Sequence, residues 1–480
     1  MADQPVPLCV DLDGALIKTN TLHEAVVALI LANPWLVCAL PFWLMRGQAY
    51  LWQRLSERVM VNPETLPYRP EALAYLKREK ESGREIILIS GAHKAVVRKV
   101  AGHLGFFDDA FGSDESLHLV GSAKLAAIAR RYGDGSFDYL GDSRADLPIW
   151  KECRQAIIVS RDRALVRRLR RNAPNVEVIE PTGKSRIRAA VAALRPHQWS
   201  KNLLLFAALF LGHKFNQPPV ALAALAGFVI FSLGSSAIYV LNDLTDLEAD
   251  RLHASKKKRP FAAGDLSAGA GLLLAISLVA VALTLAPMLS VEFAMALVGY
   301  LALAVLYTFY LKEKLLVDIF TLAGFYTIRV WAGGASTGIA ISHWALAFFM
   351  CLSLSLALAK RYAELAAQRE DGLNQSSDRP FNRRGYRPED GQFIMTLGCA
   401  SALMSVLVVA LYINSPDVLR YYRRPALLWL ICPALAYWAS RIWLIASRGE
   451  LNEDTVLFAI KDRVSYLVGA VIVITVLLSI

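Results

Sequence analysis

The chain has 480 residues, which is too long for one ordinary domain, and 55% of them are hydrophobic. The mean hydropathy of +0.39 indicates a membrane protein. The six cysteines show no paired spacing, so the sequence indicates neither a disulfide framework nor a zinc site. The net charge is +11. Residues 1–12 lack the features of a cleavable signal peptide, so we expect the N-terminal part to remain in the cytoplasm.

Up to about Arg195 the chain mixes charged and apolar residues as a soluble protein does. Short apolar runs predict buried strands, with helical segments between them, at 8–10, 86–89, 137–140, 156–159 and 176–179. Strands that alternate with helices predict an α/β fold with a parallel sheet covered on both faces. Functional sites in such folds lie at the carboxyl ends of the strands.

Polar motifs stand at these strand ends and between the strands. In chain order they are Asp11-x-Asp13, Ser90, Lys124 and Gly141-Asp142-x-x-x-Asp146. As a set they resemble the motifs of the haloacid-dehalogenase (HAD) phosphotransferase superfamily, nearest to its phosphoserine-phosphatase-like branch. The resemblance implies that Asp11 attacks phosphorus and forms an aspartyl-phosphate, while Asp13 serves as general acid and base.

The same resemblance implies a Mg²⁺ site and a phosphate site. Asp11, the backbone carbonyl of Asp13, and Asp142 would hold the metal with support from Asp146, and Ser90 and Lys124 would bind the phosphoryl oxygens. Ala15 stands where family members usually carry Thr, which removes a hydroxyl but no acid or metal ligand. A domain that has lost catalysis and serves as a scaffold is the alternative.

A cap-sized insert separates the first two motifs, at about residues 15–85. Its segment 25–45 is nearly uncharged and contains Trp35, Phe42 and Trp43. It cannot cross the membrane once, because Asp11 and Ser90 would then lie on opposite sides. We favour a cap surface that dips into the membrane or docks on the helical half over a buried cap helix.

The segment 161–195 is strongly basic, with ten Lys or Arg residues against three acidic ones. It precedes the first apolar span, so anionic lipid headgroups are favoured over nucleic acid as its partner. We therefore predict two domains, a HAD-like domain at 1–185 and a membrane domain at 186–480.

Beyond residue 195, long apolar runs predict an all-α polytopic membrane domain of about nine transmembrane helices. They lie at 202–214, 219–241, 268–288, 292–311, 315–336, 343–360, 392–413, 425–446 and 463–480. The positive-inside rule places the charged loops 242–267 and 361–391 on the cytoplasmic side, although Arg420, Arg423 and Arg424 fall on the opposite side.

The loop 242–267 carries the most informative motif, Asn242-Asp243-x-x-Asp246-x-x-x-Asp250. Its carboxylates recur at intervals of three and four, which places them on one face of a helix. Like charges beside hydrocarbon are costly unless cations neutralise them, and carboxylate-held Mg²⁺ commonly serves a diphosphate. A basic run with Arg251 and Arg259 follows at once, so the loop predicts a site for a diphosphate substrate.

The motif and its flanks resemble the UbiA superfamily of intramembrane prenyltransferases, and most closely the polyprenyl-phosphate phosphoribosyltransferases, of which decaprenyl-phosphate phosphoribosyltransferase is the known type. The stretches that support this narrower match are Arg195-Pro196-His197-Gln198-Trp199-Ser-Lys201-Asn202, Tyr307-x-x-x-Leu311-Lys312 with Asp318, Lys360-Arg361-Tyr362-x-Glu364, Arg384-Gly385-Tyr386, and Glu453-Asp454 with Lys461-Asp462-Arg463. Together they cover essentially all of 190–480.

The resemblance implies that a polyprenyl phosphate attacks phosphoribosyl diphosphate. Asp243, Asp246 and Asp250 would hold Mg²⁺ on the leaving diphosphate. The residues that would contact the substrates are Lys201, Asn202, Asn242, Arg259, Tyr307, Lys312, Lys360 and Arg361. Each basic residue could instead be a positive-inside anchor at a helix end.

Aromatic-ring prenyltransferases pair this motif with a second one of DxxxD type, which the loop 361–391 lacks. That difference favours the phosphoribosyl reaction, whose product would still carry a 5-phosphate for the HAD domain to remove. We therefore predict a bifunctional enzyme of the bacterial inner membrane that makes polyprenyl-phosphoryl ribose for cell-envelope pentosylation. A quinone-type prenyltransferase with a non-catalytic HAD module is the alternative, and homo-oligomerisation is left open.

Overall fold

The structure is a computed structural model that describes residues 6–114, 117–173, 175–374, 385–416, 418, 422–451, 458 and 462–480. Its contacts divide the chain into two compact units, each described here by itself. Unit 1 consists of Met1–Leu194 with Tyr239–Ile276, and unit 2 of Arg195–Ile238 with Ser277–Ile480. The sequence predicted a division after residue 185 and gave no sign that the acidic loop would group with the N-terminal part.

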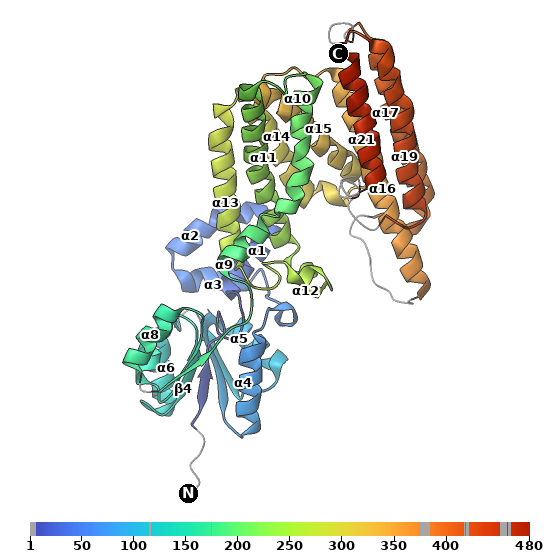
Figure 1. The fold of residues 1–480 in the computed structure, drawn as a ribbon. Helices are drawn as coiled ribbons and strands as arrows, with labels where there is room; N and C mark the ends of the chain where they lie inside the picture. The colour runs from blue at the N-terminus through green and yellow to red at the C-terminus, as the bar shows by residue number, and fades with distance from the viewer. Residues whose placement is uncertain are drawn as a thin grey trace. The chain divides into compact units, whose positions relative to one another are not determined.

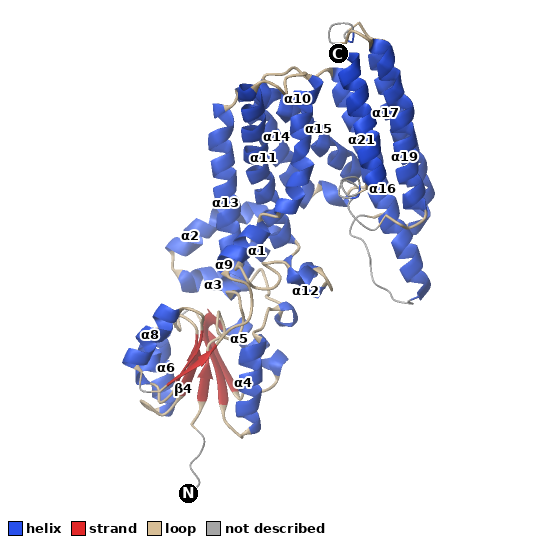
Figure 2. Cartoon of the chain, in the orientation of Figure 1, coloured by secondary structure: helices blue, strands red, loops and turns tan. Residues whose placement is uncertain are grey.

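Unit 1 is built on a six-stranded parallel sheet in the order β3-β2-β1-β4-β5-β6 (Figures 1 and 2). The strands are β1 Leu8–Val10, β2 Ile86–His93, β3 Asp109–Ser113, β4 Asp138–Gly141, β5 Ala156–Val159 and β6 Val176–Ile179. The predicted α/β fold is confirmed, and each predicted strand is present. The edge strand β3 was not predicted, because its sequence Asp-Ala-Phe-Gly-Ser lacks an apolar run and it is only half-buried.

Alternate residues of the central strands face two separate cores, as the period of a strand requires. Leu8 and Val10 belong to one core, which includes residues of helices α4 (Pro70–Glu81) and α5 (Lys94–Leu104). Cys9 belongs to the other, which includes residues of α6 (Ser122–Tyr132), α7 (Leu147–Glu152) and α8 (Arg163–Asn172). Both faces of the sheet are therefore covered by helices.

The cap between β1 and β2 is helical. Its elements are α1 Thr21–Ala32, the 3-10 helix η1 Pro34–Ala39, α2 Leu40–Met45, α3 Gln48–Ser56 and the 3-10 helix η2 Pro63–Thr65. Asn20 caps α1 by accepting a hydrogen bond of 3.0 Å from the Leu22 amide. The two connections of the cap meet where Ile17 bridges to Tyr68.

The second part of unit 1 contains the end of α11 (Pro218–Thr245), α12 (Leu247–Leu252), the 3-10 helix η5 (Lys256–Lys258) and the start of α13 (Ala268–Leu285). Helix α9 (Arg186–Ala193) completes the unit. The acidic motif is thus not one continuous helix, because α11 ends at Thr245 and Asp246 stands at the N-cap of α12.

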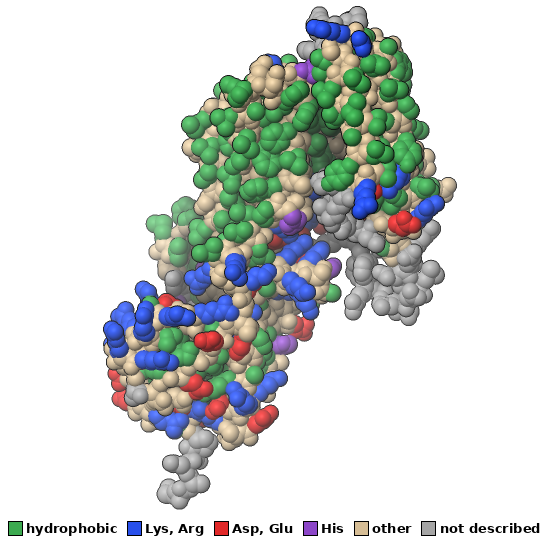
Figure 3. All heavy atoms as spheres, viewed as in Figure 1, with side chains coloured by type: hydrophobic (Ala, Val, Ile, Leu, Met, Phe, Trp, Pro, Cys, Tyr) green, Lys and Arg blue, Asp and Glu red, His purple; other side chains and the backbone are tan. Residues whose placement is uncertain are grey.

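Helices occur at all the predicted spans. Besides α11 and α13 they are η4 Pro196–Phe206, α10 Ala207–Leu211, η6 Ala286–Met288, α14 Val291–Phe309, η7 Leu311–Glu313, α15 Val317–Thr337, α16 His343–Asn374, η8 Pro388–Asp390, α17 Gly391–Ile413, η9 Pro425–Leu430, α19 Ile431–Ser447 and α21 Arg463–Ser479. Six helical stretches in the described part of the chain are long and apolar enough to cross a membrane. The helical part presents many apolar side chains on its surface (Figure 3).

Candidate active sites

Three carboxylates meet at the carboxyl end of the sheet in unit 1. Asp11 follows β1 directly, and Asp142 and Asp146 follow β4. One oxygen from each of the three lies within 4.8 Å of the others, and among the residues that the structure describes this is the one group of three such ligands. Oxygen donors alone are the ligands that Mg²⁺ prefers. These residues therefore fit the metal that the sequence predicted there.

Lys124 supplies the positive charge of this site. Its Nζ lies 2.9 Å from Asp11 Oδ1 and 3.9 Å from Asp146 Oδ1, and it also donates to the Tyr139 hydroxyl at 3.0 Å. That hydroxyl in turn donates to Asp146 Oδ1 at 2.9 Å. Lys124 is almost fully buried, so its charge is poorly screened by solvent and acts strongly on nearby oxygens.

Asp13 is held apart from the three-carboxylate group. Its two carboxylate oxygens accept hydrogen bonds from the Thr21 amide at 2.8 Å and from the Thr21 hydroxyl at 3.0 Å. Thr21 begins the cap helix α1. The side chain that was predicted as general acid and base is therefore positioned by the cap.

Burial shapes the acidity of these groups. Burial raises the pKa of Asp11 to about 7, although Lys124 opposes the shift, and burial raises the pKa of Asp13 to about 6 against the hydrogen bonds from Thr21. Burial and the charges of Asp11 and Asp146 raise the pKa of Asp142 well above its usual range. Burial works against the charge of Lys124, but Asp11 and Asp146 outweigh it and raise its pKa, so Lys124 remains an ammonium ion.

Two smaller features complete this site. Ser90 is fully buried in β2, and its hydroxyl accepts a hydrogen bond of 3.1 Å from the Ala92 amide. Gly14 adopts a φ of +82°, and a Cβ at this position would overlap the Asp142 carboxylate. The turn after Asp13 therefore requires glycine, both for its backbone conformation and for its close approach to Asp142.

The structure brings together part of the acidic motif at 242–250. Asp243 and Asp250 are buried, and one nitrogen of Arg259, Nη1, lies 3.2 Å from Asp243 Oδ1 and 2.5 Å from Asp250 Oδ2. Asp246 is half-buried, and its amide donates to the Asn242 carbonyl at 3.0 Å. The single positive charge of Arg259 offsets part of the negative charge of two of the three predicted metal ligands, and their hard oxygen donors suit Mg²⁺.

In unit 2, Asn202 lies in a buried polar network inside the helices. Its amide donates to the hydroxyls of Ser232 at 2.9 Å and Ser235 at 3.1 Å, and its carbonyl oxygen accepts from Arg329 Nε at 2.7 Å. Arg329 also donates to the Tyr300 hydroxyl at 3.1 Å. Sequence reasoning missed Arg329, although a buried arginine within the apolar segment 315–336 is a recognisable signal of a polar site.

Arg361 lies in a different buried network of unit 2. It donates to Asp318 Oδ2 at 2.8 Å and to Glu364, while the Tyr386 hydroxyl donates to Asp318 Oδ1 at 2.6 Å. The Tyr386 hydroxyl also accepts from the Leu316 amide at 2.8 Å. These motif residues thus bind one another, and Arg361 is held by two carboxylates.

The remaining predicted residues of unit 2 are more accessible. Lys360 is exposed, and Lys201, Tyr307 and Lys312 are half-buried. The motif residues Arg384, Glu453, Asp454 and Lys461 lie outside the described residues, as does Arg420.

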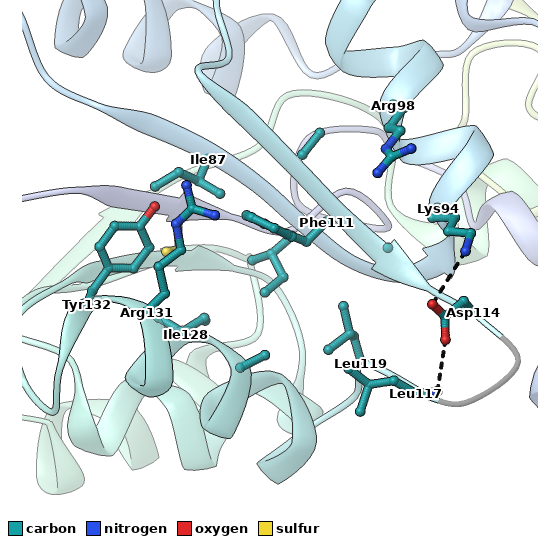
Figure 4. Close-up of a pocket in the computed structure, with 15 residues that line it drawn as sticks. Ile87, Lys94, Arg98, Phe111, Asp114, Leu117, Leu119, Ile128, Arg131 and Tyr132 are labelled. Atoms are coloured by element: carbon teal, nitrogen blue, oxygen red, sulfur yellow. Dashed lines mark hydrogen bonds and ion pairs between the residues drawn. The ribbon is translucent and has the colours of Figure 1, made fainter.

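Unit 1 contains a cavity of about 290 Å³ (Figure 4). It is lined by apolar residues such as Phe111 and Ile128 and by Arg98 and Arg131. Arg131 is already paired with Asp109 at 2.8 Å. No carboxylate of the three-carboxylate group lines this cavity, so we do not assign the catalytic site to it.

Two family models match the chain. The model of the haloacid dehalogenase-like hydrolases matches residues 9–151, and the model of the UbiA prenyltransferase family matches residues 203–461, which is more than half of the chain. The chain belongs to the UbiA prenyltransferase family. It is therefore a membrane-integral member of this family with a HAD-like domain at its N-terminus, and both families indicate enzymatic activity.

Relatives extend this comparison. The UbiA-family chain is 36% identical to the uncharacterized protein y4nM of Sinorhizobium fredii, over 98% of this chain and 90% of that protein. It is 32% identical to the nodulation protein NoeC of Azorhizobium caulinodans, over 56% of this chain and 86% of that protein. It is 38% identical to the decaprenyl-phosphate phosphoribosyltransferase of Mycobacterium tuberculosis, over 39% of this chain and 64% of that protein. The predicted resemblance to both superfamilies is thereby confirmed.

Proposed function

We propose that this protein is a bifunctional enzyme that first transfers a 5-phosphoribosyl group to a polyprenyl phosphate and then removes the 5-phosphate. One observation carries the proposal: the chain joins a UbiA domain, with relatives named decaprenyl-phosphate phosphoribosyltransferase, to a HAD domain in which three carboxylates lie together beside a buried lysine. The first activity makes a sugar phosphate monoester, which is the class of substrate that the second activity hydrolyses.

In the transfer step, an oxygen of the lipid phosphate bonds to the anomeric carbon of phosphoribosyl diphosphate, and the bond from that carbon to the diphosphate breaks. Asp243, Asp246 and Asp250 would hold Mg²⁺, which stabilises the charge that builds up on the departing diphosphate. Arg259, which forms ion pairs with two of these carboxylates, would contact the diphosphate. The phosphate nucleophile is already anionic, so the step requires no strong general base.

The resemblance implies further substrate contacts. We propose that Asn242 from the acidic motif and Lys201, Tyr307, Lys312 and Lys360 contact the substrates. Asn202 and Arg361 are engaged in buried networks of unit 2, so we propose that they support the helices of that unit.

In the hydrolytic step, Asp11 attacks the phosphorus of the 5-phosphate and the bond to the ribose oxygen breaks. Asp13 gives its proton to that oxygen and then takes a proton from the water that hydrolyses the aspartyl-phosphate. Asp11, the Asp13 carbonyl and Asp142, with support from Asp146, would hold a Mg²⁺ ion that offsets the phosphate charge. Lys124 and Ser90 would bind the phosphoryl oxygens.

The setting that we propose is a bacterial inner membrane with both sites on the cytoplasmic side. The basic helices α8 and α9 in the segment 161–195 would contact anionic lipid headgroups. Exposed arginines gather over α8 (Figure 3). The final product would be polyprenyl-phosphoryl ribose for pentosylation of the cell envelope or of glycans.

The test uses the full-length protein in lipid nanodiscs with phosphoribosyl diphosphate, polyprenyl phosphate and Mg²⁺, and follows the lipids by mass spectrometry and free phosphate by a colorimetric assay. We expect Asp243→Asn to make no ribosylated lipid. We expect Asp11→Asn to accumulate the lipid that carries the 5-phosphate, whereas Asp109→Asn, on the edge strand, should behave as wild type.

Two results would count against the proposal. If Asp11→Asn releases phosphate from the lipid product as fast as wild type, the hydrolytic step is wrong. If the protein consumes an allylic diphosphate and leaves phosphoribosyl diphosphate untouched, the transfer step is wrong.

A further inference from the structure

In the cap, η1 passes directly into α2, and together they form one short apolar helix, Pro34–Met45, called here the 34–45 helix. This helix exposes large apolar side chains. Trp35 is 90% exposed, Met45 84% and Phe42 69%. Val37 and Leu44 are also exposed. The space-filling view shows apolar side chains where α2 lies (Figure 3). Contiguous exposed apolar groups of this kind mark a surface that contacts a partner or a membrane.

The opposite side of the 34–45 helix is anchored to the core of unit 1. Leu36, Leu40 and Trp43 pack against the core cluster that also contains Leu8 and Val10 of β1. The 34–45 helix therefore has one apolar side turned inward and one turned outward.

Contacts within unit 1 place the cap at the entrance of membrane-spanning helices. Arg251 of α12 forms a buried ion pair with Glu24 of the cap helix α1. Gly269, in the first turn of α13, abuts the ring of His23, since a Cβ there would lie 2.9 Å from His23 Cγ. The cap helix α1, which precedes the 34–45 helix, is thus packed against the segment where α13 begins.

Helix α13 is itself apolar from this point. The helical stretch Ala268–Met288, which begins with α13, is long and apolar enough to cross a bilayer. Leu273, 68% exposed, and Ile276 belong to the same unit as the cap and face outward. The apolar start of α13 and the 34–45 helix therefore both belong to unit 1.

We propose that the outward side of the 34–45 helix inserts into the boundary between headgroups and acyl chains of the bilayer that this chain spans. Trp and Phe are the residues that favour this boundary, and short helices with one apolar side lie within it. Arg46 follows the 34–45 helix directly and is exposed. In this proposal it would contact lipid phosphates. This insertion requires neither proposed activity, and it would hold the HAD site beside the surface from which a lipid-linked substrate arrives.

Cys38 offers a probe within the 34–45 helix, because it is exposed while Cys9 and Cys153 are buried. We would replace the half-buried Cys351, Cys399 and Cys432 by Ala in the full chain and attach an environment-sensitive fluorophore to Cys38. The protein is then placed in nanodiscs with or without lipids that carry a quencher on their acyl chains. The matched control carries the same label at Lys77→Cys on α4, an exposed polar position, with Cys38 replaced by Ala.

We expect the label at Cys38 to emit at shorter wavelength than the control label and to lose most of its emission with the quencher lipids. The variant Phe42→Asp with Met45→Asp should return the label to a water-like spectrum. The proposal is overturned if the Cys38 label stays water-like or if the Asp variant leaves the quenching unchanged. It is also overturned if the label is shielded from water without being quenched by lipid, because a protein surface then covers the 34–45 helix.

Discussion

The ion pair between Arg251 and Glu24 is the contact of unit 1 whose removal has the most predictable cost. Arg251 Nη2 lies 2.7 Å from Glu24 Oε1, Nη1 lies 3.2 Å from Oε2, and the side chains are only 6% and 9% exposed. Glu24 Oε1 also accepts from the Thr19 hydroxyl at 2.8 Å. Replacing Arg251 by Met would leave the Glu24 carboxylate buried without its counter-charge.

The magnitude follows from this burial. Removing one partner of a buried ion pair costs about 3–5 kcal/mol, because the remaining charge is left uncompensated. Arg251 Nε has no hydrogen-bond partner among the described residues, so the native pair is imperfectly satisfied and we expect the lower limit, about 3 kcal/mol. For a domain of 150–250 residues this corresponds to a fall of roughly 6–12 °C in the unfolding midpoint.

The assay is thermal unfolding of the full-length protein in nanodiscs, followed by intrinsic fluorescence, to which the buried Trp52 and Trp150 of unit 1 contribute. Lys80→Met is the matched control, since it breaks an ion pair with Asp108 in which both side chains are more than a third exposed. Solvent screens such a pair, so its loss should cost no more than about 1 kcal/mol.

A double variant separates the ion pair from other effects of the substitution. Arg251→Met combined with Glu24→Gln removes both charges, and we expect its midpoint to lie above that of Arg251→Met alone. If Arg251→Met lowers the midpoint no further than Lys80→Met does, the cap and the acidic loop are not joined by this ion pair, and the reasoning fails.

Three further predictions concern the HAD-like site and the buried network of Arg329. Gly14→Ala should lower both the unfolding midpoint and phosphate release, whereas Gly83→Ala, at a similar φ of +83° but in open space, should cost only about 1–2 kcal/mol for its backbone and leave phosphate release unchanged. Lys124→Met should lower phosphate release by roughly 100-fold or more, measured on isolated 5-phosphorylated lipid, with the rate of ribosyl transfer as control. Arg329→Met should leave the Asn202 carbonyl oxygen unsatisfied and destabilise the helical unit by about 1–3 kcal/mol, measured as heat-induced aggregation in detergent; an unchanged aggregation temperature would contradict the network.

The HAD-like site was predictable because its chemistry is attached to local signals. Asp11 and Asp142 come directly after buried apolar runs, and parallel strands bring their carboxyl ends to one edge of the sheet. The position of Lys124 beside Asp11 required the resemblance, since the residue lies in helix α6 and nothing in its local pattern distinguishes it from other helical lysines.

Contacts between distant parts of the chain were not predictable. Glu24 and Arg251 are separated by 227 residues, and neither position differs locally from an ordinary surface charge. The helix break at Asp246 was also missed, because the spacing of three and four is equally compatible with one helix or with two short ones. The resemblance implied that Arg361 contacts the substrates, but its carboxylate partner Asp318 lies 43 residues away in the sequence, and no local pattern links the two.

The two candidate sites solve the same electrostatic problem in the same way. Lys124 lies within 4.0 Å of the carboxylates of both Asp11 and Asp146, and Arg259 bridges Asp243 and Asp250. A single cation between two buried carboxylates offsets their repulsion, which burial would otherwise make prohibitive. A divalent ion that took over the carboxylates would free the lysine or arginine for phosphate oxygens. Each candidate site therefore already contains a cation that would bind the phosphate of the proposed substrate.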